Sequence, residues 1–277
     1  MLDLTITKEQ FEHILPVFQS PTEHLFERLA HEIKVATDTI HGLVGDYADE
    51  NENIDGIVDY AKTYICATAA RRTIPQLDLV LTETGFGVVS NQHVVPASQA
   101  RVTALDESLR QKASMAWDHL LLMLLHTPWR ESDSAIARVA GLYWLPTHCR
   151  RYGVTANDKI VYDDEFCSLH PSLAMAEGKV AAMISPELYD YLVEQERTNH
   201  GGMSTATSLL LERSRNVVAA LMKEKTYPRA VQSLTKRMME TIEQYKEEFP
   251  QYTGSSTYKA KALTYENKKE DTTFFFS

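Results

Sequence analysis

The chain has 277 residues, with 44% apolar and 24% charged side chains, which is ordinary for a globular protein of one large or two smaller domains. Its formal net charge of −10 argues against a general nucleic-acid binder, because affinity for phosphate depends on basic surface, although a local basic patch stays compatible with it. The apolar runs are too short to span a bilayer, and residues 1–4 lack the basic start and apolar run of a signal peptide, so we expect a soluble protein.

The first helices of the chain are indicated by their start signals. Thr7 with Gln10 three residues later is a capping-box pattern, and it predicts a short helix that ends near Pro16. Residues 20–23, Ser-Pro-Thr-Glu, place a cap, a proline and an acidic residue where a helix start favours them. The second helix is expected to continue from there to Gly45, a typical helix stop.

The centre of the chain is predicted to combine an extended arm with a long helix. A third amphipathic helix begins near Ile54 and is expected to end at residues 71–72, before Pro75. Residues 77–97 contain two short β-prone runs around the glycines of Gly85-Phe86-Gly87, which favours a β-hairpin or an extended arm. Ser98 is positioned to cap the next helix. One apolar stripe follows along that helix: Val102, Leu105, Leu109, Ala113, Ala116, Leu120 and Leu124.

The remainder of the chain reads as a loop and a second set of helices. Residues 152–165 are predicted to be loop-like, and helices are expected from Ser185 to about residue 250. The fold class is therefore mainly α: a multi-helix bundle, with two helical halves as one possibility, a short β-hairpin or arm, and a β-like tail. The expected regions are an N-terminal helical region with its arm, a second helical region and a C-terminal tail: 1–150, 151–250 and 251–277.

The C-terminal tail is predicted to be extended. Residues 251–256 resemble a flexible polar linker, and residues 257–277 alternate polar and apolar side chains without a helical period. The three phenylalanines near its end would form an exposed apolar patch on a monomer. We therefore expect this tail to dock as an added strand, and the sequence leaves open whether it docks on its own chain or on a neighbour.

No motif predicts a catalytic, cofactor-binding or metal site. Gly85-Phe86-Gly87 lacks the third glycine and the Lys-Ser/Thr of a phosphate-binding loop. The pairs His148-Cys149 and Cys167/His170 carry metal-type side chains, but neither has a Cys-x-x-Cys partner, so buried thiols and surface histidines are the simpler interpretation. The acidic residues 163–165 lack the ligand spacing of a calcium loop. We expect a protein without enzymatic activity, cofactor or metal.

A resemblance to a known family enters at residues Leu81–Leu105. They read Leu-Thr-Glu-Thr-Gly-Phe-Gly-Val-Val-Ser-Asn-x-x-Val-x-Pro-Ala-Ser-x-x-Arg-Val-x-x-Leu. This segment resembles one in an uncharacterised family of structural proteins from tailed phages and prophages of gut bacteria, the crAss-like phages included. Residues 265–269 before an aromatic end, and the order of the parts along the chain, are similar too. The resemblance is specific over the quoted segment alone.

The resemblance implies a head–tail connector, a ring protein present in several copies below the portal of the capsid. Its implied partners are other copies of itself, neighbouring portal, connector or tail proteins, and genomic DNA that passes without sequence-specific binding; no membrane is implied. The implied location is the head–tail junction of the virion, after synthesis in the cytoplasm of the bacterial host. The expected contact residues between subunits or rings are Phe86, Val88, Val89, Phe274, Phe275 and Phe276.

Two other interpretations stay open at the level of the sequence. One is a cytoplasmic, non-enzymatic helical binding or regulatory protein whose tail folds back on its own body. The other is a hydrolase with a site assembled from histidines that are distant in the sequence, although no motif places a nucleophile beside any of them.

Overall fold

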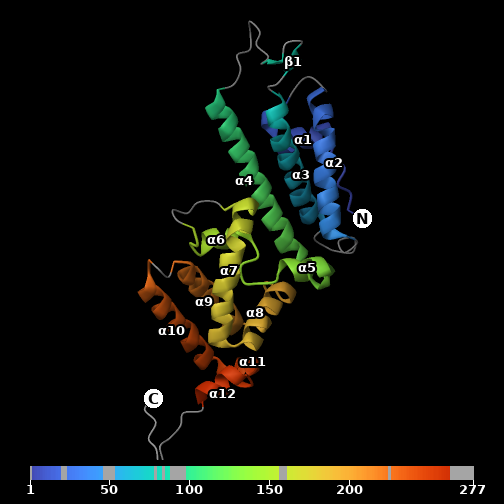
Figure 1. Ribbon diagram of the computed structural model, residues 1–277. Helices are drawn as coiled ribbons and strands as arrows, with labels where there is room; N and C mark the ends of the chain where they lie inside the picture. The colour runs from blue at the N-terminus through green and yellow to red at the C-terminus, as the bar shows by residue number, and fades with distance from the viewer. Residues whose placement is uncertain are drawn as a thin grey trace, which may run out of the picture. The chain divides into compact units, whose positions relative to one another are not determined.

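A computed structural model describes residues 2–19, 24–45, 54–77, 80–82, 85–87, 98–155, 161–223 and 226–262. These residues are mainly helical, as the sequence predicts (Figure 1). The chain divides into two compact units, the first made of residues 1–138 and 160–165 and the second of residues 139–159 and 166–277. The longer segment of the first unit ends at Arg138.

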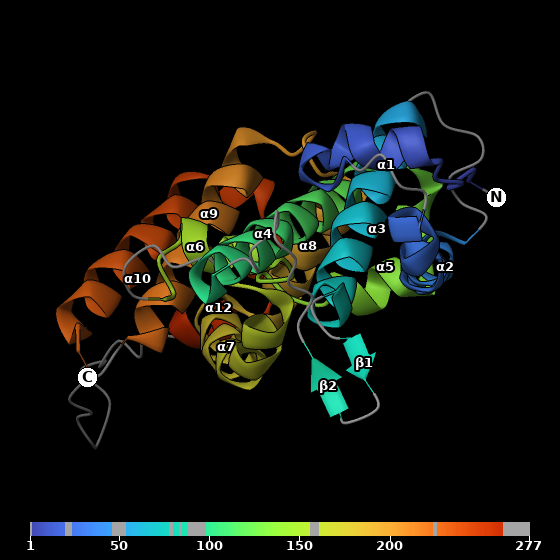
Figure 2. The same cartoon turned by 90° about the horizontal axis from the view of Figure 1, so that it is seen from above.

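The first unit is built on three long helices, with α3 packed against both α2 and α4 (Figures 1 and 2). Two short helices and two 3₁₀ turns complete it. The bounds are α1 Lys8–Ile14, η1 Pro16–Phe18, α2 His24–Val44, α3 Ile54–Leu77, α4 Gln99–Leu124, η2 Pro128–Glu131 and α5 Asp133–Arg138.

The capping box predicted for α1 is confirmed. The Thr7 hydroxyl accepts a hydrogen bond from the Gln10 backbone N–H at 3.3 Å, and the Gln10 side-chain oxygen accepts one from the Thr7 backbone N–H at 3.2 Å. This exchange satisfies two backbone groups that a helix start otherwise leaves unpaired. The helix then buries Phe11 in edge-to-face contact with Phe18 and Phe26.

The end predicted for α3 is wrong. The helix continues past Arg71 and Arg72 to Leu77, with Pro75 inside its last turns. Thr73 and Ile74 are buried, and the Thr73 hydroxyl donates to the Ala69 carbonyl at 2.9 Å. Burial of this turn against the bundle offsets the backbone hydrogen bond that a proline cannot make.

The apolar stripe predicted for α4 is confirmed from Leu109 onward, where each of its members is buried; Val102 and Leu105 are half-buried. Ser98 occupies the N-cap position, although its side chain accepts no hydrogen bond from the helix. Near the end of the helix the buried surface is wider, since Leu121 and Leu125 are buried as well as Leu120 and Leu124.

Between α3 and α4 the described residues include two three-residue strands, β1 (Val80–Thr82) and β2 (Gly85–Gly87). They pair antiparallel, with Val80 opposite Gly87, Leu81 opposite Phe86 and Thr82 opposite Gly85.

The second unit is a further group of helices in which α10 packs on α9 and α11 contacts α8. Helix α7 begins in the first unit, and its residues from 166 onward belong to the second. The bounds are α6 Pro146–Arg151, α7 Asp163–Ile184, α8 Pro186–Thr198, α9 Thr205–Met222, α10 Pro228–Gln244, η4 Lys246–Glu248, α11 Pro250–Thr253 and α12 Ser256–Ala262.

The loop predicted for residues 152–165 is wrong at its end. Residues 163–165 form the first turn of α7, where three carboxylates face the partial positive charge of a helix N-terminus. The acidic run that suggests a solvated loop is therefore also a helix-start signal.

Glu177 of α7 is a buried carboxylate that fixes the segment before α6. It accepts hydrogen bonds from the Tyr143 backbone N–H at 2.8 Å and from the Tyr189 hydroxyl at 2.6 Å. A Cβ atom on Gly141 would lie 2.3 Å from the Glu177 carboxylate, so only glycine allows this close approach. Burial raises the pKa of Glu177, while these hydrogen bonds favour its ionised form.

Arg215 of α9 and Glu196 of α8 form a buried ion pair at 2.7 Å. Arg215 Nε also donates to the Leu142 carbonyl at 2.9 Å, and Trp144 Nε1 donates to Glu196 at 3.1 Å. Desolvation opposes ionisation of Glu196, but His200 and Arg215 outweigh it and hold its pKa well below the ordinary value. The second unit thus carries a charged, hydrogen-bonded network in its interior.

The expectation of an extended chain from residue 251 is wrong for residues 251–262. They belong to α11, a two-residue turn and α12, with the Ser255 hydroxyl accepting from the Tyr258 backbone N–H at 3.1 Å. Tyr252 is buried and packs edge-to-face on Tyr258. A serine cap and an aromatic anchor therefore turn an apparently polar linker into helix. Residues 263–277, the rest of the predicted β-like tail, lie outside the described residues.

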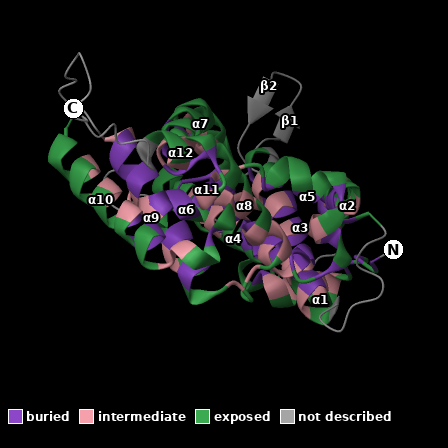
Figure 3. Ribbon diagram, turned by 90° about the horizontal axis from the view of Figure 1, so that it is seen from below, coloured by how far each residue is buried: buried purple, intermediate pink, exposed green. Residues whose placement is uncertain are grey.

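Burial follows the helix faces in both units. Residues classed as buried lie on the inward faces of the helices, whereas α10 is exposed along most of its length (Figure 3). Of the helices that the structure describes, none combines the length and apolarity needed to cross a membrane.

Candidate functional site

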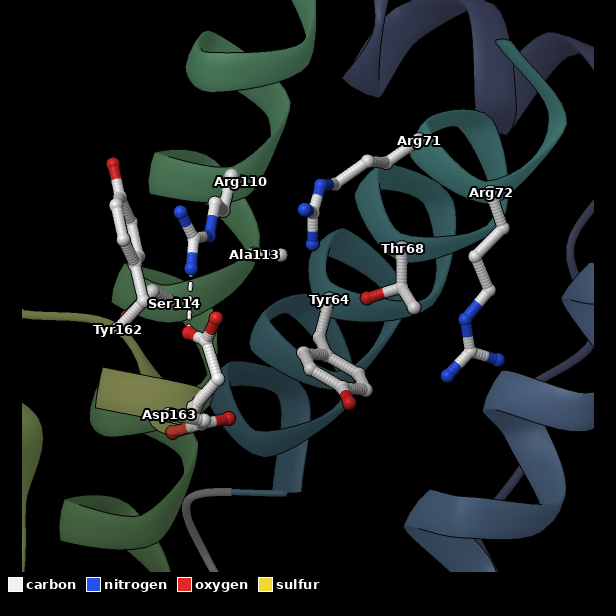
Figure 4. A pocket seen from close by; sticks show the side chains of 10 residues that line it. Tyr64, Thr68, Arg71, Arg72, Arg110, Ala113, Ser114, Tyr162 and Asp163 are labelled. Carbon is white, nitrogen blue, oxygen red and sulfur yellow. Dashed lines mark hydrogen bonds and ion pairs between the residues drawn. The ribbon is translucent and has the colours of Figure 1, made fainter. Parts of the chain in front are cut away.

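A cavity of about 320 Å³ lies in the first unit between α3, α4 and the residues around the start of α7 (Figure 4). Its walls carry guanidinium groups, hydroxyls and carboxylates beside apolar surface. The lining residues are Tyr64, Thr68, Arg71 and Arg72 from α3, Arg110, Ala113 and Ser114 from α4, and Tyr162, Asp163 and Asp164.

Helix periodicity brings these side chains to one place. On α3, Tyr64, Thr68 and Arg71 follow one another at steps of four and three residues, so they share a face. On α4, Arg110 and Ser114 are four residues apart and share the facing surface. The cavity is therefore the seam between two packed helices, closed at one side by the chain around Tyr162.

Each arginine of the cavity has an acidic partner. Arg71 Nε lies 3.0 Å from an Asp106 carboxylate oxygen, and an Arg72 nitrogen lies 3.7 Å from Glu32. Figure 4 shows the guanidinium of Arg71 turned toward Arg110 across the cavity, and that of Arg72 turned away from it.

Arg110 connects α4 to the start of α7. Its Nη2 donates to Asp164 at 2.5 Å, and its guanidinium carbon lies 3.9 Å from the centre of the Tyr162 ring. The Tyr162 hydroxyl in turn donates to Glu107 at 2.5 Å. A charge-assisted hydrogen bond and a cation–π contact thus hold one guanidinium in place.

Burial raises the pKa of three groups that line the cavity, and Arg110 lowers that of a fourth. Desolvation raises the pKa of Asp163, and Arg138 opposes this shift. Desolvation also raises the pKa of Tyr162 to about 12, with the Glu107 hydrogen bond adding to it, and it raises the pKa of Tyr64. For Asp164, the hydrogen bond and the charge of Arg110 outweigh desolvation and lower the pKa. Both phenols are therefore neutral donors at neutral pH.

The side chains that line the cavity include both hydrogen-bond donors and acceptors. It presents guanidinium and hydroxyl donors beside carboxylates, and its lining holds no cysteine or histidine that could act as nucleophile or base. Within the part of the chain that the structure describes, no group of three or more His, Cys, Asp or Glu side chains is placed to hold a metal ion.

The residues considered for metal binding differ in their burial. His148 and Cys149 are buried in α6, whereas Cys167 of α7 is exposed. Burial lowers the pKa of His148 well below its ordinary value and raises the pKa of Cys149 to about 12. Burial also raises the pKa of Cys66 to about 12, so both buried thiols stay protonated at neutral pH.

The predicted contact residues fall mostly outside the described chain. Phe86 lies in β2, where its backbone pairs with Leu81. The others lie outside the described residues: Val88, Val89, Phe274, Phe275 and Phe276.

Apart from Asp163 and Asp164, considered above only as a calcium site, the cavity residues are not among the site residues predicted from the sequence. Their spacing on α3 and on α4 is visible in the sequence, but amphipathic helices commonly carry charged residues at such steps. Which two helices pack together, and in which register, depends on tertiary contacts that periodicity does not specify.

Comparison with known proteins gives one finding. Residues 14–138 match a family model described as a family of unknown function, DUF6712. The matched segment contains α2, α3, α4 and α5, and with them the cavity residues from Tyr64 to Ser114 but not those around Tyr162. No curated protein and no solved structure matches the chain.

Proposed function

We propose that the protein is a non-enzymatic structural component of a phage virion, which assembles as a ring at the head–tail junction below the portal. In this proposal it is made in the cytoplasm of the bacterial host. Its partners are other copies of itself and the neighbouring portal, connector or tail proteins, and genomic DNA passes it without sequence-specific binding.

One observation carries the proposal: the connection between α3 and α4. The two helices pack against each other, yet residues 78–98 separate them and include the β1–β2 pair. Helix–helix connections in bundles usually need only about 2–8 residues, and longer ones are commonly functional. A ring subunit needs a rigid body and an arm that reaches a neighbour, and this connection supplies a candidate for the arm.

The segment that resembles phage structural proteins lies in the same region, which supports its role as the arm. It begins within β1 at Leu81 and ends in the second turn of α4 at Leu105. The resemblance thus covers the arm and its attachment to the bundle, rather than the interior of either unit. We propose that Phe86, Val88 and Val89 make contacts with a neighbouring subunit through this arm.

The acidic balance of the chain is compatible with passage of DNA. A formal net charge of −10 makes general adhesion of phosphate backbone unfavourable, because the two carry like charge. A wall of like charge lets DNA move along a channel without being held.

The first test is quantitative peptide mass spectrometry on phage particles purified from the producing culture. We expect this chain at a copy number comparable to that of the portal protein. Its absence from intact particles would contradict the proposal and would favour the cytoplasmic helical binding or regulatory protein as the alternative.

Two candidate arms, the α3–α4 connection and the C-terminal tail (residues 257–277), are tested in solution. Sedimentation velocity of the purified chain should show concentration-dependent assembly that Phe86→Ala or deletion of residues 272–277 weakens while circular dichroism retains the helical signal. Met175→Gln is the matched control, because Met175 is an exposed apolar residue, 73% accessible, that belongs to neither arm. If the tail docks on its own chain, deletion of residues 272–277 should instead lower the stability of the fold without changing assembly.

A further inference from the structure

We propose that the cavity around Arg71 binds a single carboxylate, supplied in the assembled ring by an acidic side chain of a second copy of this chain. The inference rests on the proposed ring function and assigns one of its contacts. It concerns Arg71, Tyr64, Thr68, Arg110 and Ser114, which the predicted contact residues do not include.

The first step concerns the two terminal nitrogens of the Arg71 guanidinium. Its Nε is bonded to Asp106 at 3.0 Å, and within the described residues no other polar partner engages its guanidinium. The Asp106 contact fixes the direction of the side chain, and Figure 4 shows the free terminal nitrogens turned into the cavity. A guanidinium whose terminal fork is free and oriented offers parallel donors that match the two oxygens of a carboxylate.

The second step is the surroundings of that fork. Thr68 and Ser114 add hydroxyls from the two facing helices, and Tyr64 adds a phenol that burial keeps protonated. The Arg71 side chain is 42% exposed, so a group from another molecule can reach it. The site thus combines an ordered donor with an open approach.

The third step uses charge to select the ligand. The arginines of the cavity already have acidic partners, and Asp163 and Asp164 stand in its wall. The site therefore has three arginines and four carboxylates and carries no excess positive charge before a ligand enters, which disfavours the double charge of a phosphate group. A carboxylate brings one negative charge and the planar geometry that the fork favours.

The fourth step concerns the source of the carboxylate. The chain has 38 acidic and 28 basic residues, so a second copy presents a surface rich in carboxylates. In a ring, one surface of each subunit meets a different surface of the next, which allows the Arg71 cavity of one copy to meet an acidic side chain of another. The contact between the Arg71 fork and that carboxylate then sets the register of the ring.

The test compares two neighbouring arginines of α3. Arg71→Gln removes the fork in the cavity, whereas the matched control Arg72→Gln removes a guanidinium that points away from it. Asp106 and Glu32, the acidic partners, are 41% and 20% exposed, so we expect both variants to fold, and circular dichroism checks this. Sedimentation velocity should show assembly of Arg71→Gln shifted to concentrations at least about tenfold higher, and that of Arg72→Gln by less than about threefold.

A third variant separates charge from geometry. Arg71→Lys keeps the charge but not the fork, and we expect it to assemble more weakly than the wild-type chain. Assembly of Arg71→Gln equal to the wild type would overturn the inference and leave the ring function standing. If the wild-type chain does not assemble at any concentration, the ring function fails instead, and the site is then judged by the following titration.

The titration uses the monomeric wild-type chain and two probes, N-acetylglutamate amide and inorganic phosphate. The Nε–Hε resonance of Arg71, assigned by its loss in Arg71→Lys, should shift saturably with the carboxylate probe and at least about tenfold more weakly with phosphate. The absence of a saturable shift, or equal binding of phosphate, would overturn the carboxylate assignment.

Discussion

The two units use charged residues in opposite ways. In the first unit, Arg71 and Asp106 are 42% and 41% exposed, and Asp164 is 73% exposed beside Arg110. In the second unit, Arg215 and Glu196 are 7% and 1% exposed. Ion pairs that water can reach are weak and exchange partners readily, whereas a buried pair is costly to break.

In the proposed function, this difference separates the residues that recognise a partner from those that stabilise the fold. The pairs of the first unit border a cavity, and their partners can be exchanged for groups of another molecule at little cost to the fold. The network of the second unit ties α8 and α9 to the segment around Leu142, and removal of Arg215 or of Glu196 leaves the other charge buried without its counter-ion. The predictions below either sharpen this contrast or remove it.

The largest effect is expected for Arg215→Met. The substitution leaves the carboxylate of Glu196 buried without its cation, which costs about 3–5 kcal/mol of stability. Hydrogen exchange should show lost protection in α8 and α9, because both helices contribute to the pair. A cost below about 1 kcal/mol would mean that the buried pair behaves like an exposed one.

The second effect is a dependence of the second unit on pH. Burial, with Arg215 adding to it, lowers the pKa of His148 well below 6.5. The unfolded chain therefore takes up a proton near pH 6.5 while the folded chain does not, so stability is full above that pH and falls as the pH drops below it. Each pKa unit of depression corresponds to about 1.4 kcal/mol.

The measurement for His148 is chemical unfolding between pH 7.5 and pH 5. The variant His148→Leu should lose most of the slope in this window, because it has no proton to bind. Glu196 does not interfere there: its pKa is lowered from 4.5, so its contribution is lost only as the pH falls below about 4.5. An unchanged slope in His148→Leu would contradict the assignment.

How far the sequence leads can be judged from particular elements. The capping box of α1 and the stripe of α4 are predictable because both depend on residues within one or two turns. The end of α3 is not, since Pro75 normally breaks a helix and only the burial of Thr73 and Ile74 offsets it. The same holds for α11 and α12, where Tyr252 of α11 is buried and packs on Tyr258 of α12 despite a polar composition.

The site is less predictable than the fold for a related reason. Arg71 and Arg110 are ordinary helix-surface arginines in the sequence, and their meeting depends on how α3 packs against α4. The residues that sequence patterns favour for contacts between subunits, such as Phe86 and Phe274, stay predictions. Apolar residues in an arm attract attention in a sequence, whereas a polar seam between two helices does not.

The third effect comes from backbone strain at Ser185. This buried residue has φ of 130° and ψ of 149°, a backbone conformation that residues other than glycine rarely adopt. Its hydroxyl caps α8 by accepting a hydrogen bond from the Leu188 backbone N–H at 3.2 Å. Ser185→Gly should relieve about 1–3 kcal/mol of strain and lose only a few tenths of a kcal/mol of capping. Ser185→Ala keeps the strain and loses the cap, so the two variants should shift the unfolding midpoint in opposite directions.

The smallest effect is expected in the first unit, for Asp164→Asn. The substitution removes the partner of Arg110, but the Asp164 side chain is 73% exposed, so the cost should stay within about 1 kcal/mol and shrink further in 1 M salt. Asp190→Asn in the middle of α8 is the control for removing an exposed carboxylate. Because Arg110 also stacks on Tyr162 at 3.9 Å, the guanidinium should keep its place without Asp164 and become available to another carboxylate. A cost of about 3 kcal/mol, comparable to that of Arg215→Met, would show that the first unit also depends on its ion pairs for stability, and an exchange of partners at its cavity would then be too costly to serve recognition.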